Sequence, residues 1–248
     1  MKRLLGSLLL LILIAGVYFR GSWLRAEIDQ QVYGPQTVAQ RLTQYGPVVE
    51  KRLKTDFTRA GVTYPPARIT LVVLKQERQL ELYAAGAAGD ALHYIKSYPI
   101  LAASGRLGPK LQQGDDQVPE GMYAVDSLNP NSHYHLALHV DYPNAFDRAQ
   151  ARTDGRTDLG GDIMIHGNAV SIGCVAMGDP ASEDLFVLAA QAGLPNVRLL
   201  FCPLDFRLTK AEPGGPDLPA WTPKLYRNLE KALGTLPLPP APTAPSSP

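Results

Sequence analysis

Short apolar segments in the middle of the chain most restrict the folds that this sequence can adopt. Residues 79–85 show the pattern clearly, because Leu80, Leu82 and Ala84 occupy every second position, as in a half-buried strand. Further segments of this kind cover residues 68–75, 91–100, 121–128, 135–141, 163–165 and 196–202. Long loops rich in Gly, Pro, Asp and Asn separate them, which predicts a mainly β sandwich or barrel-like sheet.

Helical patterns on both sides of the strands make the predicted fold class mainly β with flanking helices (α+β). Residues 36–60 carry apolar side chains at helical spacing, but Gly46 and Pro47 interrupt them. Because proline suits the first turn of a helix, two helices are expected here, the second ending at Gly61.

Two more helices are expected in the second half of the chain. Residues 182–192 are predicted to form a helix with Asp179 or Ser182 as its N-cap and Gly193 as its end. Residues 222–233 have three leucines in line at helical spacing, which predicts a short amphipathic helix.

The first residues have the composition of a targeting segment. Lys2 and Arg3 precede an almost unbroken apolar run over residues 4–19, which Arg20 ends. No small-residue cleavage site stands out, so we expect an uncleaved signal-anchor in residues 1–25, with a cleaved signal peptide as the alternative. The cytoplasmic membrane is then a partner through residues 4–19. The positive N-terminal charges place the rest of the chain in the periplasm, anchored to the inner membrane or secreted.

Composition limits the number of domains and the classes of partner. A chain of 248 residues that is 45% hydrophobic can bury one sizeable core, and its net charge of +1 gives no reason to expect nucleic-acid binding. After the targeting segment we expect a helical linker at 26–62, a β-rich domain at 63–208, a C-terminal helix at 209–235 and a disordered Pro-rich tail at 236–248.

The candidate chemistry lies in residues 163–179, where a predicted strand leads into His166 and a loop then leads to Cys174. A thiol needs a base to be a good nucleophile at neutral pH, and this loop is long enough to fold the thiol back onto the imidazole. Cys174 is therefore the candidate nucleophile and His166 the candidate base. Backbone N–H groups around Gly173 and Cys174 are candidate donors to an oxyanion.

Other interpretations of the cysteines and histidines remain open. Cys174 could be an inert buried thiol, or it could form a disulfide with Cys202 in an extracytoplasmic protein. The alternation of the last strand instead makes Cys202 a small core residue. His133, His135 and His139 could share one strand face and bind zinc, or simply form a polar strand face. No metal or other cofactor is expected.

Charged side chains in the predicted loops allow further roles. Asp115, Asp116 and Glu120 could include an acid–base pair, but their glycine-rich surroundings favour turn formation. Basic side chains could bind the carboxylates of a peptide substrate or form solvated surface. These side chains are Lys110, Arg148, Arg152 and Arg156.

The residues around Cys174 also carry a resemblance. They resemble the active-site signature of the YkuD-type L,D-transpeptidase catalytic domain, which reads His-Gly, a spacer, then Ser-His-Gly-Cys-x-Arg. His166 and Gly167 match the first part, and Ser171, Gly173 and Cys174 match the second. The resemblance implies that Cys174 is the nucleophile and His166 its base, supported by Gly167, Ser171 and Gly173.

Two positions depart from this signature. Ile172 stands where the family has its second histidine, and Ala176 stands where it has an arginine, a form that is similar to the YafK-like branch. With similar motifs in residues 98–123 and 129–148, the resemblance covers residues 64–205. It implies a YkuD-like β-sandwich that forms the catalytic domain.

The resemblance also implies a function. A cysteine enzyme of this family attacks the peptidoglycan stem peptide at the L,D bond after its third residue, and the resulting thioester passes to an amine or to water during cell wall remodelling. The YafK-like branch resembles enzymes that hydrolyse the link between peptidoglycan and a lipoprotein, which makes that lipoprotein a second expected partner. The alternatives are an ordinary 3-3 cross-linking transpeptidase and a non-catalytic, membrane-tethered wall-binding module.

Overall fold

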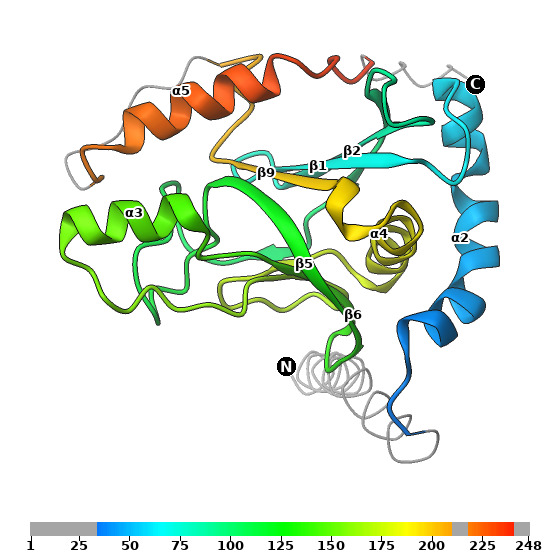
Figure 1. Ribbon diagram of the computed structural model, residues 1–248, viewed down its shortest axis with the longest axis horizontal. Helices are drawn as coiled ribbons and strands as arrows, with labels where there is room; N and C mark the ends of the chain where they lie inside the picture. The colour runs from blue at the N-terminus through cyan, green and yellow to red at the C-terminus, as the bar shows by residue number, and fades with distance from the viewer. Residues whose placement is uncertain (1–33, 210–217, 241–248) are drawn as a thin grey trace, which may run out of the picture.

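The computed structural model describes residues 34–209 and 218–240 (Figure 1). The predicted signal-anchor at residues 1–25 lies outside these ranges, as does most of the predicted tail. None of the helices within the described ranges is long and apolar enough to cross a membrane.

Nine strands of the described residues form one sheet in the order β3-β2-β1-β9-β5-β6-β7-β8-β4. The sheet turns at β5, because the first part of this long strand pairs with β9 and the rest pairs with β6. The two halves of the sheet enclose the main core, so the predicted fold class, mainly β with flanking helices, is confirmed (Figure 1). The strands are β1 Arg68–Leu74, β2 Gln79–Ala85, β3 His93–Pro99, β4 Ala102–Ala103, β5 Gly121–Ser132, β6 His135–Val140, β7 Met164–His166, β8 Val175–Ala176 and β9 Val197–Cys202.

Strand alternation gives the half-sheet around β1 and β9 two apolar faces. Leu71 and Leu199 point into the main core between the halves. Val72, Leu200 and Cys202 point to the outer face, where the C-terminal helix α5 (Thr222–Leu233) covers them. Cys202 is thus a core residue, as predicted. Both cysteines are free, so the alternative of a Cys174–Cys202 disulfide is wrong.

The first described helix, α2 (Val38–Ala60), passes through Pro47 without a break, so the prediction of two helices is wrong. Gly46 lacks the Cβ that would clash with the proline ring in a helical conformation. An internal proline costs about 3 kcal/mol, but burying each large apolar side chain gains roughly 1.5–3 kcal/mol. The buried face continues beyond Pro47 through Val49, Leu53 and Phe57, which offsets that cost.

The other helices differ from the sequence predictions at their ends. Helix α3 (Ala145–Asp154) was not predicted; Asn144 caps it through a reciprocal bond with Asp147. Helix α4 (Asp179–Ala192) ends at Gly193 as predicted, but its N-cap is Gly178, so Asp179 and Ser182 do not cap it. A 3-10 turn (Leu194–Asn196) then leads into β9.

The chain that follows α5 packs onto the outer face of the sheet. Leu236 is buried, and the carbonyl of Pro237 accepts a hydrogen bond of 3.1 Å from the Tyr83 hydroxyl. The prediction of a disordered tail from residue 236 onward is therefore wrong for its first two residues. Residues 241–248 lie outside the described part of the chain.

A buried arginine joins the end of the β-rich domain to the sheet. Arg207 donates to both carboxylate oxygens of Glu81 at 2.8 and 2.9 Å and to Asp205 at 2.8 Å. All three side chains are almost fully buried. Two buried carboxylates therefore depend on one guanidinium.

Arg207→Met should lower the free energy of unfolding by about 3–5 kcal/mol, because it leaves buried carboxylates without a counter-charge. Urea denaturation of the purified protein measures this loss. Arg148→Met, at an exposed position on α3, is the matched control and should change stability by no more than about 0.5 kcal/mol. Equal stability of the two variants would contradict a structural role for the Arg207 cluster.

Candidate functional site

Parallel pairing of β7 with β8 brings the two predicted catalytic residues to one face of the sheet. Ile165 lies opposite Val175, and His166 lies opposite Ala176. Ile165 and Val175 point into the core. Because alternate residues of a strand share a face, His166 and Cys174 point to the other side. His166 ends β7 and Cys174 directly precedes β8, so the two are diagonal neighbours.

The backbone fixes the tautomer of His166. Its Nδ1 donates to the Gly167 carbonyl at 2.6 Å, which leaves the lone pair of Nε2 available. Only 2% of His166 is exposed, and the ring of Tyr134 lies over it at a centroid distance of 4.8 Å. Burial lowers the pKa of His166, so the imidazole is held in the neutral form that can accept a proton.

The turn after His166 has no room for a side chain. A Cβ added to Gly167 would lie 2.6 Å from Asp179 Oδ1 and 2.8 Å from the Tyr134 carbonyl oxygen. The same Asp179 carboxylate accepts a hydrogen bond of 2.8 Å from the Asn168 N–H. Asp179 therefore fastens this turn to the start of α4.

Two serines hold the backbone in front of Cys174. The Ser171 hydroxyl accepts from the Cys174 N–H at 3.1 Å, and Ser104, next to β4, accepts from the Gly173 N–H at 2.6 Å. Gly173 adopts φ = 88°, which favours glycine. The N–H groups predicted as oxyanion donors are thus already paired, and either one can serve an oxyanion only after its serine hydroxyl moves away.

The thiol of Cys174 is protonated in its resting environment. It donates to the carbonyl of Asp162 at 3.5 Å. Burial raises the pKa of the Cys174 thiol, and the negative charge of Asp162 raises this pKa further, while a hydrogen bond from the Met164 backbone and the positive charge of Lys110 lower it. Its contact in this structure is with Asp162, and the predicted proton transfer to His166 stays a prediction.

Lys110 is a buried cation in the loop that faces Cys174. Its side chain is 5% exposed and donates to the Gln112 carbonyl at 2.8 Å and to the Asp115 carboxylate. Asp115 also accepts from the backbone N–H groups of Leu111, Gln112 and Gln117. Lys110 is therefore fixed in place rather than solvated.

The acidic cluster of residues 115–120 is structural. Asp115 organises its own turn, and Glu120 pairs with buried Lys75 at 2.9 Å. Asp116 is exposed and makes no side-chain hydrogen bond among the described residues. The three carboxyl groups do not converge, so they do not form the acid–base pair that the sequence left open.

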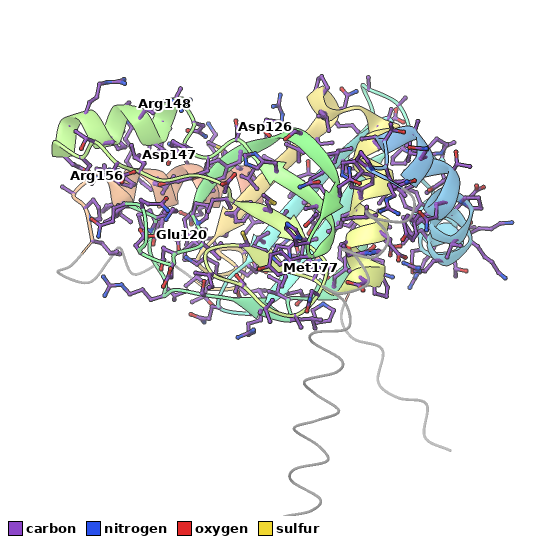
Figure 2. The ribbon with its side chains drawn as sticks, turned by 90° about the horizontal axis from the view of Figure 1, so that it is seen from below. Glu120, Asp126, Asp147, Arg148, Arg156 and Met177 are labelled. Atoms are coloured by element: carbon purple, nitrogen blue, oxygen red, sulfur yellow. The ribbon has the colours of Figure 1, made fainter. Side chains whose placement is uncertain are left out.

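The remaining predicted residues lie apart from Cys174 or are engaged elsewhere. Arg156 contacts Asp154 and the Leu111 carbonyl. Arg148 lies with α3 at one end of the molecule, away from Met177, which directly follows β8 and lies nearer the middle (Figure 2). Arg152 is exposed on the same helix.

The three histidines considered for zinc do not share a site. His135 pairs with Glu183 at 3.1 Å, and His139 pairs with Asp126 at 2.8 Å. His133 is exposed. Within the described part of the chain, no three His, Cys, Asp or Glu side chains form a group that could hold a metal ion.

A known protein family matches the part of the chain that contains this site. Residues 68–195, just over half of the chain, match the model of the YkuD L,D-transpeptidase catalytic domain. The chain belongs to this family. The match begins with β1 and ends in the 3-10 turn before β9, so it contains His166, Cys174 and both serines of the site.

The chain is similar to a curated family member in sequence and to several solved structures in fold. The Escherichia coli K12 protein named "Putative L,D-transpeptidase YafK" is 38% identical over 148 residues, which cover 58% of this chain and 56% of YafK. The chain thus matches only about half of that relative's length. Among solved structures, the helical cell shape determining protein Pgp2 of Campylobacter jejuni is 22% identical with a TM-score of 0.44, covering 60% of this chain and 54% of Pgp2. L,D-transpeptidase 1 of Mycobacterium tuberculosis is 12% identical with a TM-score of 0.32, and the match covers 54% of this chain and 62% of that protein.

Substitutions of Lys110 and Asp162 should shift the pH dependence of thiol alkylation in opposite directions. Lys110→Met removes a positive charge that lowers the pKa of Cys174, so the alkylation midpoint should move to higher pH. Asp162→Asn removes a negative charge that raises this pKa, so the midpoint should move to lower pH. Iodoacetamide labelling of native protein at a series of pH values, with Cys174 quantified by mass spectrometry, measures both shifts.

Asp162 is exposed and in a left-handed conformation that asparagine tolerates, so its variant should fold normally. Shifts of both variants in the same direction would exclude the charge arrangement described for Cys174.

Proposed function

We propose that this member of the L,D-transpeptidase family is a cysteine enzyme that acts on peptidoglycan stem peptides through a thioester on Cys174. The observation that carries the proposal is the placement of Cys174 and His166 on one face of the paired strands β7 and β8, with Nδ1 of His166 bonded to the backbone. This arrangement leaves Nε2 of His166 as the nitrogen that can accept the proton of the Cys174 thiol.

The resting protonation states determine how the first step proceeds. The thiol is protonated and the imidazole is neutral, so proton transfer accompanies attack rather than preceding it. His166 Nε2 takes the thiol proton as sulfur bonds to the carbonyl carbon of the scissile amide on the stem peptide. The imidazolium then gives that proton to the departing amine as the C–N bond breaks, and the acyl group stays on sulfur.

The second step returns the enzyme to its starting state. Water or an acceptor amine, deprotonated by His166, attacks the thioester carbonyl, and the thiolate leaves and recovers its proton. The oxyanion of both steps forms next to the N–H groups of Gly173 and Cys174, so turnover requires the hydroxyls of Ser104 and Ser171 to release them.

Substitution of the two cysteines tests the proposal. Cys174→Ala should abolish release of products from sacculi, with a loss of at least about 10³-fold, and should leave the melting temperature nearly unchanged. Cys202→Ala removes a fully buried side chain from the outer face of the sheet, so it should lower stability by about 1–2 kcal/mol and retain activity. Muropeptide analysis and thermal denaturation measure the two effects. Wild-type turnover by Cys174→Ala would refute the mechanism and favour the wall-binding module.

The two departures from the family signature favour hydrolysis over cross-linking. Ile172 is 78% exposed beside the nucleophile, where it offers an acceptor amine no polar contact. Ala176 is fully buried between Ala102 of β4 and His166 of β7, so an arginine at this position would have no space. The site therefore lacks two groups that could hold a stem-peptide acceptor. The proposed reaction is hydrolysis of the peptidoglycan–lipoprotein link, as in the YafK-like branch, in the periplasm with residues 4–19 in the inner membrane.

Two substrates given separately distinguish the outcomes. Sacculi with attached lipoprotein should release the lipoprotein, and purified tetrapeptide muropeptides should give few 3-3 dimers, because the acyl-enzyme meets water more readily than a held amine. Mass spectrometry quantifies both products. Abundant 3-3 dimers, with no lipoprotein released, would assign the protein to the ordinary cross-linking transpeptidases instead.

A further inference from the structure

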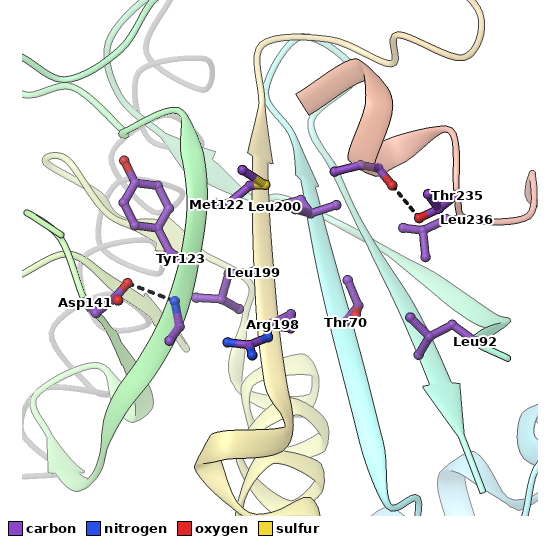
Figure 3. Close-up of a pocket in the computed structure, with 12 residues that line it drawn as sticks. Thr70, Leu92, Met122, Tyr123, Asp141, Arg198, Leu199, Leu200, Thr235 and Leu236 are labelled. Atoms are coloured by element: carbon purple, nitrogen blue, oxygen red, sulfur yellow. Dashed lines mark hydrogen bonds between the residues drawn. The ribbon is translucent and has the colours of Figure 1, made fainter. Parts of the chain in front are cut away.

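Helix α5 leaves part of the outer face of the sheet uncovered. It packs over the row that contains Val72 and Leu200. In the next row, Arg198 of β9 lies between Thr70 of β1 and Ala124 of β5, with which it is in register. This row forms the floor of a cavity of about 430 Å³ (Figure 3). That volume lies within the roughly 300–1,000 Å³ typical of ligand sites.

The cavity has apolar walls around a cationic floor. Leu92, Met122 and Leu236 line it, and an adjoining cavity of about 310 Å³ shares Thr70, Leu92 and Arg198 and adds Arg68. We call the two cavities together the outer-face groove. The groove lies on the β1–β9 half of the sandwich, whereas Cys174 faces outward from the β7–β8 half. It is thus a separate site from the proposed catalytic one.

Three donors of the outer-face groove have no acceptor among the described residues. Arg198 is exposed and forms no hydrogen bond or ion pair there. Thr70 is 5% exposed, and its hydroxyl makes no hydrogen bond. Arg68 donates through Nη2 to the Asp90 carbonyl at 2.7 Å, but its Nε is buried without a partner. Since buried polar groups are normally paired, the Arg68 Nε indicates a missing acceptor, and the donors of Arg198 and Thr70 line the same cavity.

The nearby carboxylates do not supply this acceptor. Asp141, on the rim, accepts from the Ala124 N–H at 2.8 Å (Figure 3). Asp90 accepts from the Ala87 N–H at 2.9 Å. Neither Arg68 nor Arg198 forms an ion pair with a carboxylate of the described residues, so no such group neutralises their charges within 4 Å. Guanidinium matches the planar shape of a carboxylate, and the apolar walls suit short aliphatic side chains.

We propose that the outer-face groove binds a carboxylate of a peptidoglycan peptide and so provides a second, non-catalytic contact with the wall. The choice of peptide rests on the proposed function, whereas the anion site rests on Arg198, Thr70 and Arg68 alone. Two contacts on opposite faces of the sandwich would raise the effective affinity for a cross-linked wall beyond that of either site.

The four methionines of the chain allow both sites to be observed in one experiment. Met122 lines the groove, Met164 contacts Cys174 through its backbone, Met177 follows β8, and Met1 serves as a reference. Full-length protein labelled at the methionine methyl groups is titrated with a tripeptide muropeptide that has free carboxylates, and NMR shifts are recorded for each methyl. Met122 should shift in a saturable manner.

Variants and modified probes then assign the binding groups. Arg198→Gln should weaken the affinity reported by Met122 at least about tenfold, and Thr70→Val should weaken it about threefold or more. Shifts at Met164 and Met177 should be retained, as should activity on a short substrate. Arg148→Gln is the matched control and should change nothing. Amidation of the muropeptide carboxylates should abolish the Met122 shift.

Several results would overturn the proposal. These are an unshifted Met122, an equal effect of Arg148→Gln, binding that survives amidation, or tighter binding of inorganic phosphate than of the muropeptide. A shift of Met122 without one at Met164 or Met177 would support the groove while the proposed catalytic function fails. The two inferences are therefore tested independently.

Discussion

The parallel pairing of β7 with β8 is the constraint on which the site depends. Ile165 and Val175 are fully buried in the core, and their burial fixes the register of the two short strands. A slip of one residue would turn both away from the core and point His166 and Cys174 into it. The same hydrophobic contact that stabilises the fold therefore determines which side chains meet at the outer face. Ile165 and Val175 thus contribute both to stability and to the placement of His166 and Cys174.

A buried ionic network holds the loop that carries Ser104 and Lys110, two residues that influence Cys174 and the turn before it. Lys75, which directly follows β1, donates to Glu120 and to the backbone carbonyls of Gly108 and Val118. Glu120 also accepts from the Gly108 N–H and from the Tyr226 hydroxyl of α5. The loop that carries Ser104 and Lys110 is thereby fastened to both the sheet and the C-terminal helix. Removing one member would leave a buried charge unpaired, which makes this loop geometry part of the fold rather than a surface feature.

The sequence predicted those elements whose signal is local. Alternation identified the longer strands, and the family signature identified His166 and Cys174. Strands β4 and β8 have two residues each, too few for a periodic pattern, and α3 carries a weak apolar face behind a capping signal at Asn144. Ser104 lies 69 residues from the Gly173 N–H that it accepts from, so no spacing could have indicated it. The helix through Pro47 was mispredicted because tertiary burial outweighed a local break.

The position of β9 has a consequence for the order in which the molecule can assemble. This strand lies between β1 and β5 in the sheet, yet among the strands it is the last to be synthesised. Until it arrives, β1 and β5 have no partner for their facing edges, and neither half of the core can close. A ribosome, which delivers the N-terminus first, therefore releases an incomplete sheet until β9 emerges. Closure of the sheet must wait until nearly the whole chain has been synthesised, so its stability comes late and depends on contacts between distant segments.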